Sequence, residues 1–407
     1  MGMMKIVKGG VTKAKGFEAA GVEANIKYQG RTDMAIIFSK EPCVAAGTFT
    51  TNVAKAAPVT WDQKIVKEGK VAQAIIVNSG IANACTGAEG YGYCKDTADA
   101  AAKELGISED SVLLGSTGVI GKQLPIDRIQ AGVKMLAEAK SDTVQAGTEA
   151  AKATDTCEKE IAVEIEIGGK TVTIGGMAKG SGMIHPNMCT MLSFITTDAA
   201  ISKTALQKAL SEDVDDTYNM ISVDGDTSTN DTVLVIANGM AENEKIVEGT
   251  KEYEVFAEAL HEINEYLAKK IAGDGEGATA LFEVNVVGAQ TKEQAVLLSK
   301  AIACSNLTKT AIAGHDANWG RIICAMGYSG AQFDPEKVDL FFESAAGKIQ
   351  IAENGTAVDY SEEKATEILS QPIVTATADV KMGDAKATAW GCDLTHGYIE
   401  INADYRS

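Results

Sequence analysis

The sequence predicts an α+β fold arranged as two lobes. Strand-like apolar runs and helix-like patterns alternate along all 407 residues, with no fixed-period repeat and no low-complexity linker. Residues 163–174 hold two segments of strand character joined by Gly168-Gly169, which is a strong hairpin signal. Because hairpins are mixed with helices, we expect α/β layers rather than a purely parallel, doubly wound sheet. A chain of this length is too long for one small domain.

The first half is expected to hold strands at 34–38 and 74–77 and helices at 95–105 and 125–139. The first helix stops at Gly106, because glycine commonly ends helices. Pro125 opens the second helix, since proline suits a first turn. The hairpin at 163–174 leads directly into a loop that carries Lys179, so this loop is expected to project from the end of a sheet.

The second half is expected to hold strands at 192–195, 233–237 and 281–287 and helices at 204–210 and 254–271. The longest helix has apolar residues at helical spacing and ends at Gly273. Thr291 and Gln294 have the spacing of a capping box for a further helix. The dividing line between the lobes is expected near residue 190.

Composition narrows the class of protein. A formal net charge of -19 and a pI of about 4.7 argue against binding to nucleic acid or to a membrane surface. They fit a cytoplasmic protein that handles small molecules. The eight cysteines form no CxxC pair and are expected to be reduced core thiols. No signal peptide is visible, and no segment has the roughly 18 uninterrupted apolar residues of a membrane span.

Residues 177–195 are the most informative segment. A glycine loop that carries Lys179 runs into Thr190, which opens a buried apolar run. If the peptide bond before Thr190 were cut, this residue would have a free α-amine beside its own hydroxyl, which is a nucleophile with its own base. The alternative is a glycine turn between two strands with a threonine at the strand entrance, because threonine is common in strands.

Two glycine-rich segments are candidates for binding negative charge. Residues 115–121 read GSTGVIG, and their backbone can present N–H groups to an oxyanion, with the Thr117 hydroxyl beside them. The alternative is an ordinary strand-to-helix loop. Residues 273–277 resemble a phosphate loop weakly, because no lysine follows the glycines. Within them, Glu276 is either an exposed functional carboxylate or a solvated turn residue.

The four histidines give little indication of a metal site or a catalytic triad. His185, His261, His315 and His396 are far apart, and none forms an HExxH or close HxH pair, so no metal site is expected. His261 is expected at the surface or boundary of its helix. His315 and Asp316 leave a Ser-His-Asp or Cys-His triad open.

Together these segments resemble the ornithine acetyltransferase family, the bifunctional glutamate N-acetyltransferases of arginine biosynthesis. The resemblance covers nearly the whole chain. It rests on residues 45–52, 77–87, 115–121, 154–156, 177–192, 274–279, 314–321 and 400–407. The 177–192 segment is highly specific, whereas the glycine segments are not specific singly.

The resemblance implies a precursor that cleaves itself between Cys189 and Thr190. An α chain of residues 1–189 and a β chain of residues 190–407 would remain folded together, in the family's two-lobed, N-terminal-nucleophile-like fold. Thr190 would be the nucleophile, and Thr117 and Gly118 would hold the oxyanion.

The family's substrate-binding residues map onto Thr156, Lys179, Thr190, Glu276, Asn402 and Ser407. From charge, we expect Lys179 to bind a substrate carboxylate and Glu276 a substrate ammonium.

The implied activity is ping-pong transfer of an acetyl group from N-acetylornithine to glutamate through acetyl-Thr190. No cofactor or metal is implied, and acetyl-CoA remains open as a co-substrate. The implied assembly is a heterotetramer of two α and two β chains in the cytoplasm. The rivals are a self-processing N-terminal nucleophile amidase or aminopeptidase, and a non-catalytic amino-acid-binding protein.

Two residues depart from the family's pattern. Cys189 replaces the usual alanine before the nucleophile, and because it is also small, self-cleavage is still expected. Ile81 stands where asparagine is expected, at a position with no catalytic role by resemblance.

Overall fold

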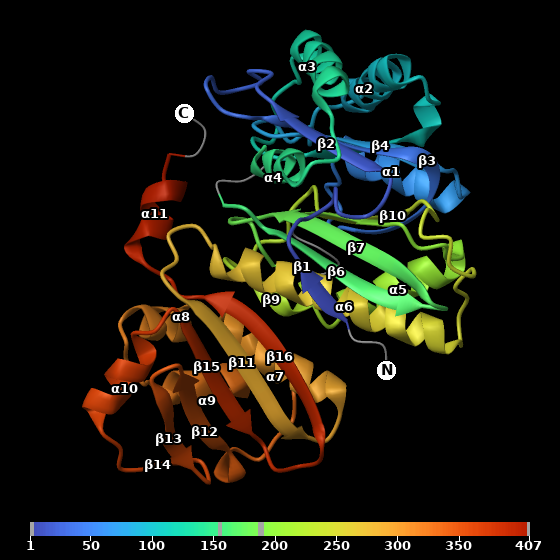
Figure 1. Ribbon diagram of the computed structural model, residues 1–407. Coiled ribbons are helices and arrows are strands. Elements are labelled where there is room, and N and C mark those ends of the chain that lie inside the picture. Colours follow the sequence, from blue (N-terminus) through green and yellow to red (C-terminus); the bar gives the residue numbers. More distant parts are fainter. Residues whose placement is uncertain (1–3, 154–156, 186–190, 405–407) are drawn as a thin grey trace. The chain divides into compact units, whose positions relative to one another are not determined.

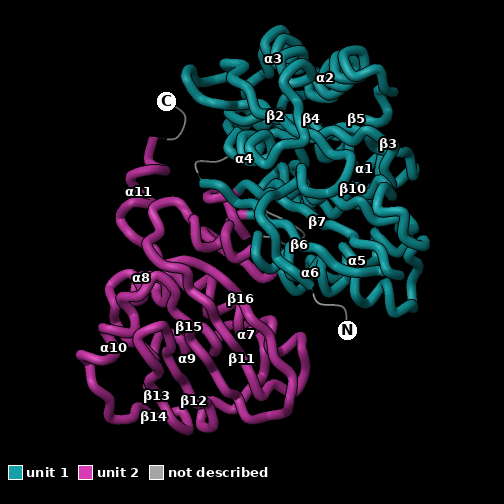
Figure 2. Tube along the Cα trace, in the orientation of Figure 1, with its two compact units in different colours: residues 1–179, 187–218, 227–267 teal, residues 180–186, 219–226, 268–407 magenta. Residues whose placement is uncertain are grey.

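The computed structural model describes residues 4–153, 157–185 and 191–404 (Figure 1). Thr156, Cys189, Thr190 and Ser407 therefore lie outside the described residues. The chain divides into two compact units (Figure 2). Unit 1 comprises residues 1–179, 187–218 and 227–267, and unit 2 comprises residues 180–186, 219–226 and 268–407. In the described ranges, every helix is too short or too polar to cross a membrane.

Unit 1 is built on a sheet that has nine strands among the described residues, in the order β1-β6-β7-β8-β10-β3-β4-β5, with β2 paired to β3. The strands are β1 (Lys5–Val7), β2 (Phe17–Val22), β3 (Met34–Phe49), β4 (Ala72–Asn78), β5 (Val112–Ser116), β6 (Glu160–Ile167), β7 (Lys170–Lys179), β8 (Leu192–Thr197) and β10 (Thr232–Ala237). The pairs β4–β5 and β8–β10 are parallel, and the other pairs of this sheet are antiparallel. This mixture confirms the expected α+β class.

The helices of this part of the chain are α1 (Ala57–Glu68), α2 (Glu89–Leu105), α3 (Ile126–Ala139), α4 (Val144–Lys152), α5 (Lys203–Val214) and α6 (Lys251–Gly273). Gly106 ends α2 in the left-handed conformation that its lack of a Cβ permits, as the sequence predicts. The helix begins earlier than expected, at Glu89.

The hairpin between β6 and β7 is confirmed. Ile167 pairs with Lys170, so Gly168 and Gly169 form a two-residue turn. Both glycines have positive φ, 59° and 77°, which is what a type I′ turn requires. β7 then runs to Lys179 at the end of the sheet.

β8 and β10 lie inside the sheet, although both come from residues after 190. β8 pairs with β7 on one side and with β10 on the other, and β10 pairs with β3. All twelve residues of the two strands are buried. The outer strands on both sides belong to residues before 190, so the part of the chain after residue 190 is held on two edges by the part before it.

Unit 2 is built on a sheet whose seven described strands have the order β14-β13-β12-β15-β11-β16-β9. They are β9 (Ile221–Ser222), β11 (Leu281–Ala289), β12 (Asp339–Ser344), β13 (Gly347–Glu353), β14 (Thr356–Ala357), β15 (Ile373–Asp379) and β16 (Ala385–Cys392). The helices are α7 (Lys292–Cys304), α8 (Asn306–Ala313), α9 (Trp319–Gly327), α10 (Glu362–Leu369) and α11 (His396–Asn402). Short 3-10 turns lie at Glu109–Ser111 in unit 1, at Tyr218–Met220 across the boundary of the two units in the sequence, and at Pro335–Lys337 in unit 2.

The cap of α7 follows the sequence prediction, whereas the boundary between the units does not. Thr291 caps α7 as predicted, because its side chain accepts the N–H of Gln294. The boundary between the units differs from the expected dividing line near residue 190: β8 belongs to unit 1, and the main body of unit 2 begins at Ala268. The two chains expected from scission, 1–189 and 190–407, are a separate prediction.

Candidate active site

The glycine loop after β5 lies beside the loop after β4, because the parallel pair β4–β5 brings both strand ends to one edge. The Ser116 hydroxyl donates to the Asn78 side chain (2.6 Å), and the Thr117 N–H donates to the Asn78 carbonyl (3.0 Å). The Val119 N–H donates to the Gly80 carbonyl (3.1 Å). These bonds fix the backbone on both sides of Gly118.

Gly118 can only be glycine in this conformation. Its φ is +124°, and a Cβ atom would lie 2.3 Å from the Gly80 carbonyl carbon. The Gly118 N–H and the Thr117 hydroxyl make no hydrogen bond to any residue that the structure describes, and both residues are only half-buried. Two adjacent donors on a fixed backbone are therefore available to a ligand oxygen, the arrangement that stabilises a tetrahedral oxyanion.

Asn230 is a supporting residue that the sequence analysis missed. Its buried side-chain amide donates to the carbonyls of Ala82 (2.6 Å) and Ser116 (2.8 Å), and so ties the two loops together. It is the middle residue of a polar Thr-Asn-Asp triplet that directly precedes the buried strand β10, and the contrast between this triplet and the apolar strand is the sequence signal that marks it.

The structure also accounts for Ile81. Its side chain is buried in the apolar core, its backbone pairs with Val119, and its carbonyl accepts the Asn78 side-chain amide (2.9 Å). Ile81 thus supports the donor loop through its backbone while its side chain fills the core.

Lys179 ends β7 and is half-buried. Its Cα partner on β8 is Leu192, two residues after Thr190 in the chain. The register of β7 and β8 therefore ties Lys179 to the beginning of the strand that Thr190 precedes.

In unit 2, Glu276 and Asn402 contact each other. The Asn402 side chain donates to the Glu276 carboxylate (2.8 Å) and to the Tyr398 carbonyl (3.0 Å). The Glu276 N–H donates to Ser181 (2.8 Å), and a Cβ on Gly182 would lie 2.3 Å from the Glu276 carboxylate. This carboxylate is therefore oriented between the loop that follows Lys179 and the C-terminal helix α11.

The structure places the predicted site residues as follows. Thr117, Gly118 and Lys179 lie in unit 1, and Glu276 and Asn402 lie in unit 2. Thr156, Cys189, Thr190 and Ser407 fall outside the described residues.

His185 and His261 make specific contacts. The Nδ1 atom of His185 lies 3.1 Å from the Ser222 hydroxyl and 3.5 Å from the Cys304 sulfur, and burial, with the charge of Lys300, lowers the pKa of His185. His261 lies at a boundary, as expected. The hydrogen bond that His261 donates to Asp213 is the main cause that raises the pKa of His261 to about 10.

The triad left open at His315 has no support in the described part of the chain. The exposed His315 ring lies 3.3 Å from the Ser370 hydroxyl, but the Asp316 carboxylate accepts from Asn318 instead of orienting the imidazole. A Ser-His-Asp mechanism needs the carboxylate on the second ring nitrogen.

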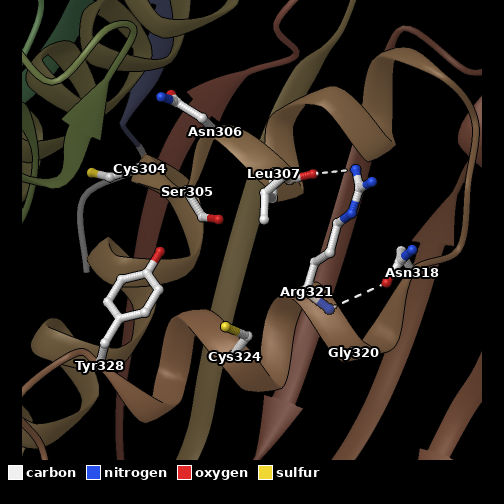
Figure 3. Close-up of a pocket in the computed structure, with 9 residues that line it drawn as sticks. All are labelled: Cys304, Ser305, Asn306, Leu307, Asn318, Gly320, Arg321, Cys324 and Tyr328. Atoms are coloured by element: carbon white, nitrogen blue, oxygen red, sulfur yellow. Dashed lines mark hydrogen bonds between the residues drawn. The ribbon is translucent and has the colours of Figure 1, made fainter.

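The segment 314–321 has structural roles (Figure 3). Asn318 caps α9 by accepting the Arg321 N–H (3.2 Å), and the Arg321 guanidinium donates to the Leu307 carbonyl (2.7 Å). The pocket beside them has a volume of about 460 Å³. Its lining residues are Cys304, Ser305, Asn306, Leu307, Asn318, Gly320, Arg321, Cys324 and Tyr328.

Comparisons with known proteins identify the family of the chain. The model of the ArgJ family matches residues 18–407. The arginine biosynthesis bifunctional protein ArgJ of Thermotoga neapolitana is 54% identical over 394 residues, which are 97% of this chain and 99% of that protein. Its namesake in Caldanaerobacter subterraneus is 50% identical over 407 residues, 99% of this chain and 100% of that protein.

Among solved structures, the Bacillus halodurans arginine biosynthesis bifunctional protein argJ is 47% identical, with a TM-score of 0.51. The match covers 53% of this chain and 100% of that chain. The family match and the identity over nearly the full length to relatives named as bifunctional proteins of arginine biosynthesis together show that this chain belongs to the ArgJ family.

Proposed function

We propose that the chain transfers the acetyl group of N-acetylornithine to glutamate through an acetyl-Thr190 intermediate, after cleaving itself before Thr190. The observation that carries the proposal is the pair of available donors, the Gly118 N–H and the Thr117 hydroxyl, on a backbone fixed against Gly80. Acyl transfer develops negative charge on the carbonyl oxygen, and a donor pair of this kind supplies the stabilisation it needs.

The proposed chemistry starts with Thr190 as the new N-terminus. An α-amine with its ordinary pKa of about 7.7–8.0 is partly unprotonated at neutral pH and accepts the hydroxyl proton. The Thr190 oxygen attacks the acetyl carbonyl, the C–N bond breaks, and ornithine leaves with the proton on its amine. Glutamate then attacks the acetyl ester, and Thr190 regains its proton, which completes a ping-pong cycle.

The sheet of unit 1 supports scission without dissociation. β8 and β10 lie between β7 and β3, so a cut between residues 189 and 190 leaves backbone pairing between the two pieces on both sides. The matched Bacillus halodurans chain is consistent with such a cut, because its full length spans little more than half of this chain. Residues 190–407 are 218 of the 407 residues.

The substrate roles follow from charge. We assign Lys179 to a substrate carboxylate and Glu276, with Asn402 beside it, to the ammonium of ornithine. Thr156 and Ser407 are included by family resemblance. The assembly we propose is a heterotetramer of two copies of each piece, and glutamate acetylation by acetyl-CoA is a further proposed activity, consistent with the name "bifunctional" of the relatives.

The experiment incubates the protein with N-acetylornithine, with and without glutamate. The proposal predicts N-acetylglutamate that forms only when both substrates are present. Free acetate released at the same rate without glutamate would instead identify a self-processing amidase. Acetyl-CoA and glutamate as sole substrates test the further activity, and a chain that binds amino acids without turnover would be a binding protein.

A further inference from the structure

The loop that leads towards Thr190 is bound along one short segment of unit 2. The Asp224 carboxylate accepts the N–H groups of Met183 (2.6 Å) and Ile184 (2.9 Å), one on each oxygen. The Val223 N–H donates to the Ile184 carbonyl (2.6 Å). The Ser222 hydroxyl lies 3.1 Å from the His185 ring. Three consecutive residues thus contact three consecutive residues of the loop.

We infer that residues 222–224 form a cradle that positions the loop 183–185 for self-cleavage, with Asp224 as its main positioning residue. The inference rests on the proposed scission before Thr190 and assigns a role to residues outside the expected set. Asp224 is no catalytic residue here, because it contacts the backbone of the loop and acts through it.

A carboxylate suits this task. Two successive backbone N–H groups directed at one anion give charge-assisted hydrogen bonds, which are stronger than neutral ones. Met183 has a φ of +55°, a left-handed conformation that costs a non-glycine residue energy, so the loop needs fixed partners to hold this geometry. The N–H of this strained residue is one of the two that Asp224 accepts.

The cradle also lies across the proposed cut. The loop 183–185 would belong to the first piece, and residues 222–224 would belong to the second. Positioning matters most before the cut, because intramolecular attack requires the reacting atoms to be held in near-attack geometry. His185 stands five residues before Thr190 in the sequence, so the cradle holds the described residues nearest to the proposed cut on its N-terminal side.

The test compares scission rates of full-length chains made by cell-free translation and sampled over time on denaturing gels. Asp224→Asn removes the charge and one acceptor and should slow scission about tenfold or more. Ser222→Ala removes the hydroxyl that contacts the His185 ring and should slow scission about threefold. Asp334→Asn is the matched control, because Asp334 also accepts a backbone N–H in unit 2, that of Glu336, and should cleave at the wild-type rate.

Two further measurements separate positioning from general stability. Once cleaved, the Ser222→Ala protein should have the wild-type kcat and a wild-type melting temperature, whereas a structural defect would lower both. If Asp224→Asn does not fold, Ser222→Ala decides the question.

If the wild-type chain cleaves and Asp224→Asn and Ser222→Ala cleave at the same rate, the cradle alone is overturned. The same follows if Asp334→Asn slows scission as much as Asp224→Asn does. A wild-type chain that never cleaves overturns the proposed function, and the cradle's role with it.

Discussion

The α-carbon of Gly118 lies so close to the backbone of Gly80 that a Cβ atom on it would come within 2.3 Å of the Gly80 carbonyl carbon. The neighbouring Val119 N–H donates to the same Gly80 residue (3.1 Å). Contact between two backbones cannot be relieved by moving a side chain. The position of the Gly118 N–H is therefore tied to the loop after β4, and this makes it suitable as a preorganised donor.

Gly118→Ala should reduce kcat for acetyl transfer by roughly 10² or more, the loss typical of removing one oxyanion donor. The new methyl group would displace the loop, and the positive φ of residue 118 would strain an alanine there. The matched control is Gly121→Ala, which also has positive φ but no atom within 4 Å of the added Cβ. The control should lose about 1–2 kcal/mol of stability while keeping its activity. Equal activities of the two variants would contradict the account.

Thr117→Val should lower kcat by roughly 10²–10³ with little change in KM, because the hydroxyl would act in the transition state and not in substrate binding. Valine retains the branched shape of threonine and removes only the hydroxyl. Thr117→Ser restores the donor and should recover most of the activity. Steady-state kinetics of the three proteins measure this. A raised KM with an unchanged kcat in Thr117→Val would place the hydroxyl in binding instead.

Asn402→Ala should raise the KM for N-acetylornithine about tenfold, because the Glu276 carboxylate loses the side chain that orients it. The control is Glu400→Ala on the same exposed helix, which should leave KM unchanged. Kinetics at saturating and limiting substrate separate KM from kcat. If both variants raised KM alike, the effect would belong to the helix and not to the contact between Asn402 and Glu276.

Local signals predicted much of the fold. The prediction of a hairpin at 163–174 was correct because two adjacent glycines, Gly168 and Gly169, are enough to specify its turn. The length of β3 was not predictable, because residues 39–42 are mostly polar and include Pro42, which interrupts a strand pattern. The strand continues through a register shift between Phe38 and Cys43, and its second half is fixed by pairing with β10, almost 190 residues further along the chain.

The residues of the candidate site were also predictable only in part. Thr117 and Gly118 could be proposed from a local glycine pattern and the family resemblance. Asn230 and Asp224 could not, because their roles depend on distant partners: Asn230 holds Ser116, and Asp224 holds Met183 and Ile184. A polar residue near the end of a strand gives no indication of which remote loop it will contact.

The contact between His261 and Asp213 should make the unfolding free energy of the protein depend on pH. Hydrogen bonds that His261 donates to Asp213 and, to a smaller extent, to Glu265 raise the folded-state pKa of His261 to about 10, against about 6.5 in an unfolded chain. The stabilisation is therefore fully present below about pH 6.5 and is lost as the pH rises through about 10. The difference in unfolding free energy between wild type and His261→Gln, measured by denaturant titration, should shrink over this range. A difference independent of pH would contradict the assignment.

The most direct test of the central claim is the intact mass of the purified chain before and after incubation with N-acetylornithine alone. The account predicts two masses, those of residues 1–189 and 190–407, and the addition of one acetyl group to the second piece, removed again by glutamate. The Thr190→Ala variant should give one mass and take up no acetyl group. A wild-type chain that remains a single species of 407 residues, or an acetyl group found on the first piece, would contradict the account.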